Sequence, residues 1–244
     1  KLVPKGVEPM SSAERLTLLP LASLASKDGD DDEPAINLLA ITPGTSLAFG
    51  RSTGRFEERV LAYAFLRELW GASPFGAKRS RWIFFQGIGR ENADDRLKNL
   101  AKSAEYRNAA RTHAKLFSET VEAIDRERHA LRLPPIRAMF DELDAKLERY
   151  SKGDFPVNLR SLRGEFLSEV RRALATVGIS MLQPDLVVLD EFQRFKDLLD
   201  PQPENWAADL AKRLFEFKDP ETGRPTRTLL LSATPYRMYT TTED

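Results

Sequence analysis

Three short and almost continuous apolar runs stand out along the chain, and small polar residues end or follow each of them. The runs occupy residues 36–41, 185–190 and 228–232. Apolar runs of this length, bounded by turn residues, are typical of strands buried in a parallel sheet. The polar residues at their ends are Thr42, Asp190 and Ser232. We therefore predict that the three strands lie in one parallel sheet, with these three residues at the same edge.

Between the first and second runs, apolar residues recur three or four positions apart, which is the spacing of one helix face. The segments with this pattern are 56–70, about 91–132, 136–150 and 159–181. The second segment carries many charges of both signs, and we expect a long amphipathic helix or a helical hairpin with Leu131 on its apolar face. These charges fit a solvated face better than a binding site, because their signs are mixed. The run at 82–88 fits either a strand or a buried helix.

Strands that alternate with helices indicate an α/β domain with a mostly parallel sheet. Between the last two strands we expect a short helix at 192–199, an amphipathic helix at 204–217 and a turn at 219–225. The sequence therefore predicts an α/β domain whose two parts, 1–55 and 182–244, are separated by a mainly helical insertion at 56–181.

The composition is that of an ordinary globular protein, since 41% of the 244 residues are apolar and 30% are charged. The formal net charge is zero, so any contact with nucleic acid must come from a local patch. The absence of cysteine excludes disulfides, thiolate catalysis and cysteine-based zinc sites. Because no apolar run approaches the roughly 20 residues that span a bilayer, we expect a cytoplasmic protein that does not enter a membrane.

The clearest chemical pattern is the pair of carboxylates, Asp190 and Glu191, that ends the second apolar run. In open α/β sheets, ligands bind outside the carboxyl ends of the strands. One carboxylate at such a place can hold Mg²⁺ on nucleotide phosphates, and the next can orient or deprotonate the attacking water. Taken alone, the same pair also fits a simple exposed strand end.

A second pattern, Ser232-Ala233-Thr234-Pro235, ends the third apolar run. Hydroxyl residues before proline are common in loops, so this segment alone also fits ordinary loop chemistry. Together, however, the two patterns deliver carboxylates and hydroxyls to the same rim of the predicted sheet. The pair favours a nucleotide site over two unrelated strand ends.

These segments resemble the motifs of superfamily-two helicases. Residues 190–193 (Asp-Glu-Phe-Gln) resemble motif II, the Walker B box Asp-Glu-x-His/Gln, and 232–234 (Ser-Ala-Thr) resemble motif III. Residues 193–196 are similar to those that follow the box in Swi/Snf-type translocases, and 42–44 (Thr-Pro-Gly) are similar to motif Ib. The resemblance covers three short segments in the family's order and leaves the helical block unmatched. It implies part of the first RecA-like motor lobe, a DEAD/DEAH-like fold.

The resemblance also implies an activity, namely ATP hydrolysis coupled to movement on DNA or RNA, with ATP and Mg²⁺ as ligands. Asp190 would hold Mg²⁺ through water, and Glu191 would be the general base for the water that attacks the γ-phosphate. Gln193 would sense the nucleotide, and Ser232 and Thr234 would couple hydrolysis to domain movement.

The implied partners are nucleic acid, with DNA favoured over RNA, and the second RecA-like lobe of the same parent chain. The residues that would contact the sugar-phosphate backbone are Thr42, Pro43, Gly44, Thr45, Ser46 and Arg51. For Arg51, the alternative is an ordinary solubilising charge.

One departure from the family pattern is the absence of the phosphate loop Gly-x-x-x-x-Gly-Lys-Ser/Thr from this sequence. Residues 44–52 come closest, but the segment is one residue too long, and Arg51 stands in the place of the lysine. We expect the loop to lie upstream of Lys1 and the second lobe downstream of Asp244. The segment alone is then not expected to hydrolyse ATP at a useful rate.

Two other functions compete with the motor hypothesis. One is a degenerate motor lobe that serves as a helical protein-interaction module without ATPase activity, and the intact Asp190 and Glu191 argue against it. The other is a phosphate-loop ATPase that does not act on nucleic acid, which Gln193 and residues 232–235 disfavour. A basic cluster at 78–81 precedes Trp82, which could indicate a tryptophan that stacks on a nucleic-acid base. Because the run around Trp82 is apolar, packing of this residue in the core is the favoured interpretation.

Overall fold

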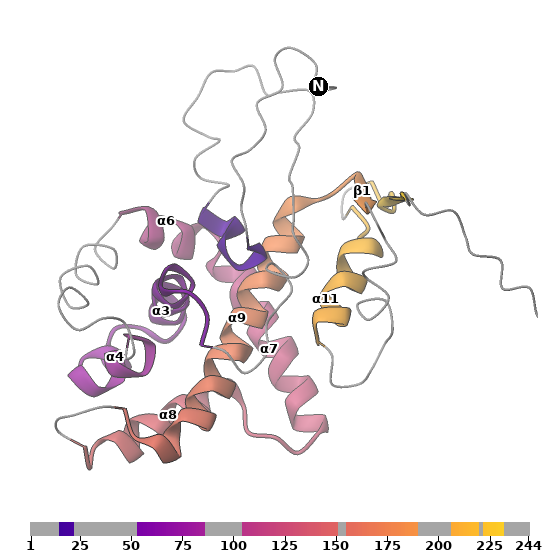
Figure 1. Cartoon of the computed structure of the whole chain (residues 1–244). Coiled ribbons are helices and arrows are strands. Elements are labelled where there is room, and N and C mark those ends of the chain that lie inside the picture. Colours follow the sequence, from indigo (N-terminus) through magenta and orange to yellow (C-terminus); the bar gives the residue numbers. More distant parts are fainter. Residues whose placement is uncertain are drawn as a thin grey trace, which may run out of the picture. The chain divides into compact units, whose positions relative to one another are not determined.

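The computed structural model of the chain (Figure 1) describes residues 15–21, 53–85, 104–150, 155–189, 206–219 and 222–231. The chain divides into two units, 1–182 and 183–244. The described part of the first unit contains η1 (Leu16–Leu18), α3 (Phe56–Trp70), η2 (Ser73–Phe75), α4 (Lys78–Phe85), α6 (Ala104–Thr112), α7 (Ala114–Ala130), α8 (Ile136–Leu147), η3 (Val157–Leu159) and α9 (Arg160–Leu182). The described part of the second contains β1 (Leu186–Leu189), α11 (Trp206–Phe215) and β2 (Arg227–Leu230).

The first unit is built around α9, which contacts α3, α7, α8 and η1 (Figure 1). Residues four positions apart on this helix, Phe166, Val170 and Leu174, are fully buried, as their spacing predicts. The helical periodicity between 56 and 181 is therefore confirmed for the described residues. The assignment of this block as an insertion between two parts of a sheet domain stays a prediction.

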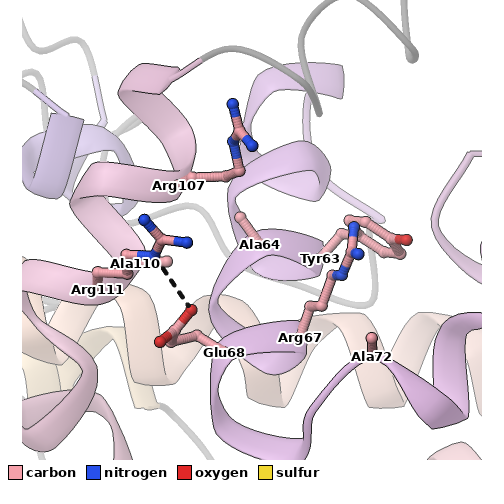
Figure 2. A pocket seen from close by; sticks show the side chains of 8 residues that line it. All are labelled: Tyr63, Ala64, Arg67, Glu68, Ala72, Arg107, Ala110 and Arg111. Atoms are coloured by element: carbon pink, nitrogen blue, oxygen red, sulfur yellow. Dashed lines mark ion pairs between the residues drawn. The ribbon is translucent and has the colours of Figure 1, made fainter.

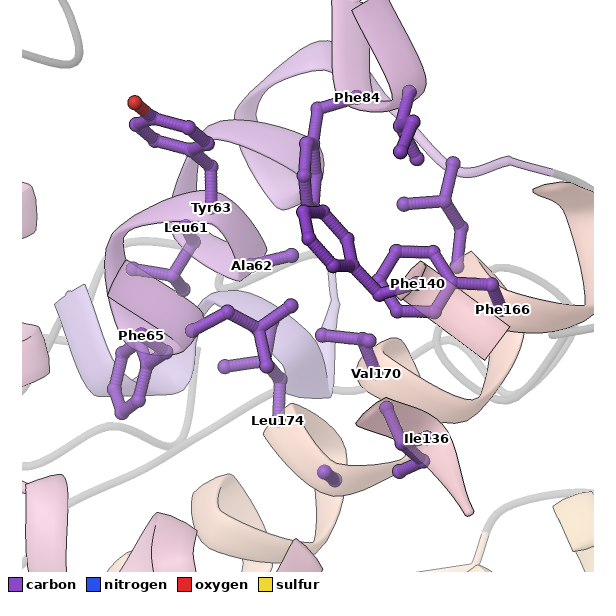
Figure 3. Packing of buried hydrophobic residues seen from close by; sticks show 14 of the residues in the cluster. Leu61, Ala62, Tyr63, Phe65, Phe84, Ile136, Phe140, Phe166, Val170 and Leu174 are labelled. Carbon is purple, nitrogen blue, oxygen red and sulfur yellow. The ribbon is translucent and has the colours of Figure 1, made fainter. Parts of the chain in front are cut away.

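Aromatic rings fill the centre of this unit (Figure 3). Phe84 lies 5.8 Å from Phe166 and 6.5 Å from Phe140, and Phe140 lies 5.9 Å from Phe166, between ring centroids. The three rings come from α4, α8 and α9, so the cluster joins elements that are far apart in sequence. Tilted and edge-to-face pairs of this kind add about 0.5–1.5 kcal/mol each beyond the burial of their area.

The ambiguous run at 82–88 is helical as far as the structure describes it, because α4 continues to Phe85. Ile83 and Phe84 are neighbours in sequence, and both are fully buried. Trp82 is partly buried and its ring lies 5.7 Å from that of Phe155. A helix with core on more than one side explains why neither helical nor strand spacing is clear here.

Two buried arginines bind the carboxyl end of α4. Arg59 donates to the carbonyl oxygen of Phe84 over 3.2 Å, and Arg163 donates to that of Ile83 over 2.5 Å. These carbonyls belong to the last turn of the helix, where positive charge is favourable. Burial, together with the charge of Arg59, lowers the pKa of Arg163 to about 10.

The segment predicted as one long helix or a hairpin contains two consecutive helices, α6 and α7, which meet at His113. The apolar face of α7 is buried at Phe117, Val121 and Ile124, but Leu131 is 71% exposed. The placement of Leu131 on the apolar face is therefore wrong. The reason is that the chain leaves the helix after Ala130 and turns through a positive φ of 58° at the next residue but one.

A buried carboxylate, Glu58, joins three elements. It accepts hydrogen bonds from Thr17 Oγ1 at 2.7 Å, from Arg15 at 3.1 Å, from Arg171 Nε at 3.1 Å and from the backbone N–H of Arg55 at 2.6 Å. Burial raises the pKa of Glu58, but the Arg171 guanidinium and these donors outweigh it and hold the pKa below its ordinary value.

The segment that supplies Arg15 and Thr17 lies so close to α9 that the helix has no room for a side chain there. A Cβ added at Gly178 would meet the backbone carbonyl oxygen of Leu16 well inside van der Waals distance. Gly178 therefore permits the contact between η1 and α9.

The second unit holds a two-stranded parallel sheet, with Leu186 opposite Arg227 and Leu189 opposite Leu230. Two of the three predicted strands are thus confirmed as parallel neighbours, and the predicted strand at 36–41 lies outside the described residues. The RecA-like identity of the sheet stays a prediction.

The prediction that these strands are buried is wrong for the part of the chain that the structure describes. Leu186 and Val188 are 54% and 50% exposed, and Leu229 and Leu230 are 47% and 48% exposed. A pair of parallel strands leaves both of its faces open unless further strands and helices cover them. In the described part of the unit these four side chains remain about half exposed.

We predict that Glu58→Gln lowers the free energy of unfolding by about 3 kcal/mol at neutral pH, because it leaves the buried Arg171 guanidinium without its counter-ion. Because the pKa of Glu58 is lowered, its stabilising effect is present above the ordinary pKa of 4.5 and is lost as the pH falls through the lower folded-state value. Urea unfolding at a series of pH values measures both effects. The control is Glu142→Gln, whose exposed pair with Lys146 should change stability by less than about 1 kcal/mol. If the two variants unfold at the same urea concentration at neutral pH, the prediction is contradicted.

We also predict that Gly178→Ala destabilises the chain by about 1 kcal/mol, although alanine is the better helix former. The gain in helix propensity is about 1 kcal/mol, whereas forcing a methyl group against the backbone costs about 1–3 kcal/mol. Gly76→Ala is the matched control, because its Cβ would lie at an ordinary 3.5 Å from Ser73 O. Urea unfolding of both variants tests this, and a stabilised Gly178→Ala variant would show that η1 does not pack on α9.

Candidate functional site

The residues predicted to carry the chemistry lie outside the described part of the chain. They are Asp190, Glu191, Gln193, Ser232 and Thr234 in the nucleotide motifs, and Thr42, Pro43, Gly44, Thr45, Ser46 and Arg51 in the nucleic-acid motif. The structure does describe the strands that lead into the two nucleotide motifs, and these strands define the edge at which the motifs begin.

The carboxyl ends of β1 and β2 lie side by side. Leu189 is the register partner of Leu230, and the N–H of Leu231 donates to the carbonyl oxygen of Leu189 over 2.8 Å. In sequence, Asp190 follows directly after Leu189, and Ser232 follows directly after Leu231. In sequence, the two motif segments therefore follow the same end of two adjacent parallel strands. Counted from the paired residues Leu189 and Leu230, Asp190 comes one residue later and Ser232 two residues later.

The amino ends of the two strands are joined by two further hydrogen bonds. The hydroxyl of Thr226 donates to the carbonyl oxygen of Pro184 over 2.7 Å, and the N–H of Arg227 donates to that of Asp185 over 3.0 Å. A slip of one residue would turn every side chain of a strand to the opposite face. Bonds at both ends of the pair therefore fix which residues emerge at the carboxyl edge.

The turn predicted at 219–225 is found before β2 in its described residues. The Asp219 carboxylate accepts from the N–H of Thr222 at 2.9 Å, and the Asp219 carbonyl accepts from the N–H of Gly223 at 2.8 Å. Gly223 has a φ of +69°, a conformation in which glycine is favoured. Lys218 and Pro225 then form an antiparallel bridge across this turn, which brings the chain back into β2.

One residue of the basic cluster beside Trp82, Arg79, has a structural role. Arg79 Nε lies 3.2 Å from a carboxylate oxygen of Asp144, and its terminal nitrogen lies 3.5 Å from Glu148. Ser80 donates to the same Asp144 carboxylate over 2.7 Å. These contacts hold α4 against α8, and with Trp82 packed on Phe155 they support the core interpretation over base stacking.

A pocket of about 270 Å³ between α3 and α6 was missed by the sequence analysis (Figure 2). Its lining contains arginines from both helices, one tyrosine, one glutamate and small residues: Tyr63, Ala64, Arg67, Glu68, Ala72, Arg107, Ala110 and Arg111. The available signal was the recurrence of arginine one turn apart, at 107 and 111. The pairing of α3 with α6, which creates the pocket, leaves no mark in either segment alone.

Within the described ranges, no cluster of three or more histidine or acidic side chains is arranged to hold a metal ion. None of the helices described is both long and apolar enough to cross a membrane.

Comparison of the chain with protein-family models, with curated proteins and with solved structures finds no match.

Proposed function

We propose that the chain is a segment of the first motor lobe of an ATP-dependent helicase or translocase that moves on nucleic acid. The observation that carries the proposal is the parallel pairing of β1 with β2, with Leu189 opposite Leu230. A nucleotide site of this kind needs its acidic and hydroxyl motifs at the same sheet edge. An antiparallel pair would have sent the two motifs to opposite ends of the sheet.

The residue types at this edge fit the chemistry of ATP hydrolysis. Carboxylate oxygens are the ligands that Mg²⁺ prefers, and Asp190 is the first carboxylate after β1. Mg²⁺, when bound, would neutralise charge on the nucleotide phosphates. Glu191 is the next residue, so a second carboxylate follows the first in sequence. The two carboxylates can therefore do different work, Asp190 toward the metal ion and Glu191 as the acceptor of the water proton.

The remaining roles follow from the family resemblance and from residue chemistry. Gln193 can hydrogen-bond the nucleotide through its amide, and the hydroxyls of Ser232 and Thr234 can link the nucleotide state to domain movement. Thr234 precedes Pro235 in sequence, and a residue before proline is biased away from the helical conformation. In this proposal the backbone of nucleic acid is contacted by residues 42–46 and Arg51, with DNA favoured over RNA.

We predict that Glu191→Gln in the full-length gene product lowers ATP turnover by about 10²-fold or more, because general-base catalysis contributes at least that much. Nucleotide binding is expected to persist or to tighten, since the substitution keeps the size of the side chain and removes a negative charge near the phosphates. Steady-state hydrolysis and equilibrium binding of a fluorescent ATP analogue measure the two quantities. A variant that hydrolyses ATP at the parental rate would show that Glu191 is not the base.

The companion variant is Ser232→Ala with Thr234→Ala, which is expected to reduce movement along nucleic acid more than it reduces ATP hydrolysis. Equal loss of both activities would remove the coupling role of these hydroxyls without removing the ATPase. If the unaltered full-length product shows no ATP hydrolysis with either DNA or RNA present, the alternative of a degenerate lobe that serves as a protein-interaction module is correct.

A further inference from the structure

The pocket between α3 and α6 has a cationic lining (Figure 2). α3 contributes Arg67 and Glu68, and α6 contributes Arg107 and Arg111. The three guanidiniums are charged at any physiological pH, so they outnumber the single carboxylate. Alanines on both helices also line the pocket, and their small side chains leave the space open. A local excess of positive charge of this kind selects an anion.

Tyr63 is the aromatic residue of the pocket lining, and its hydroxyl can donate a hydrogen bond. Only 6% of the residue is exposed, and its ring lies 5.2 Å from that of Phe75 and 5.5 Å from those of Phe84 and Phe85, between centroids. Tyr63 lies one helical turn before Arg67 (Figure 2), so the hydroxyl and the guanidinium are presented on the same face.

The side chains of Arg67 and Arg111 are exposed to solvent, where a ligand can reach them. Glu68 is 3.9 Å from Arg111, and their side chains are 42% and 67% exposed, so this ion pair is weak in water. Arg67 is exposed and has no ion-pair partner among the residues that the structure describes. An incoming anion would therefore not have to break a strong internal interaction.

The size of the pocket indicates what kind of anion it takes. Sites that enclose a whole small molecule usually measure about 300–1,000 Å³, so a pocket of about 270 Å³ suits one group of a longer molecule. Guanidiniums bind phosphate with two parallel hydrogen bonds. Since the chain has no net charge, contact with a polyanion requires a local patch such as this one.

We propose that this pocket binds a backbone phosphate of single-stranded nucleic acid, with Arg67 and Tyr63 as the central contacts. The inference rests on the proposed function in taking nucleic acid as the ligand. It adds to that function a contact in the helical unit, separate from the residues 42–46 named by the family resemblance. Such a contact is independent of base sequence, as tracking along a strand requires.

The test measures binding of a fluorescent oligo-dT to the full-length gene product by anisotropy, without ATP and over a series of salt concentrations. Arg67→Gln is expected to weaken binding about tenfold at low salt, as for the loss of a charge-assisted hydrogen bond. It should also lower the slope of log K against log salt by about 0.7, as for one phosphate contact on a single strand. Tyr63→Phe, which keeps the ring in the core, is expected to weaken binding about threefold to tenfold with an unchanged slope.

The matched control is Arg126→Gln, which removes an exposed arginine from α7 and is expected to bind like the parent. If Arg67→Gln and Tyr63→Phe bind oligo-dT with the affinity and salt slope of this control, the proposal is overturned. Equal affinity for a poly-glutamate peptide, or for inorganic phosphate alone by calorimetry, would also overturn it. The proposed ATPase is tested separately through Glu191→Gln, because oligo-dT binding is measured without ATP and the hydrolysis assay leaves the pocket unaltered.

Discussion

A carboxylate that is removed from water stays charged only where several donors surround it, and Glu58 meets this condition by drawing on three separate elements. Thr17 comes from η1, Arg171 from α9, and the backbone N–H of Arg55 from the start of α3. The rotation of α3 about its axis is therefore fixed at its first turn. Tyr63, on the next turns of the same helix, then packs into the aromatic core, and Arg67 faces solvent. The pocket with α6 depends on this orientation.

Several charged residues of this chain hold helices together through buried hydrogen bonds and ion pairs. Arg128 is almost fully buried, and it donates to the carboxylates of Glu165 and Glu169 and to the carbonyl oxygen of Pro134, which fixes α7 to α9 and to the bend before α8. A guanidinium can do this because it offers five donors on a long apolar stem. The lining of the pocket between α3 and α6 contains three arginines and one glutamate, which is a local excess of positive charge on a chain of zero net charge.

The sequence predicted α8, α9 and the parallel direction of β1 and β2, because strong periodicity and the apolar runs are local properties. It did not predict the exposure of Leu131, which follows from a positive φ at the next residue, or the helical state of the run at 82–84, where Trp82, Ile83 and Phe84 meet core on different sides. The resemblance of residues 190–193 and 232–234 to nucleotide motifs rests on residue order alone and stays a prediction. The pocket could not be predicted, because its arginines come from two separate segments and are brought together only by the contact between α3 and α6.

A parallel strand pair such as β1 and β2 needs burial of its apolar faces and a fixed register, and these two properties have different origins here. Leu186, Val188, Leu229 and Leu230 are about half exposed in the described part of the chain, and a two-stranded pair is marginal in water by itself. Register has a different origin, because the bonds at each end of the pair, such as that from Thr226 to Pro184, lie within these strands and the turns that precede them. Changing the groups that pack on these faces would therefore affect the stability of the strand pair more than its register. The geometry on which a nucleotide site depends is thus set by the strand pair itself.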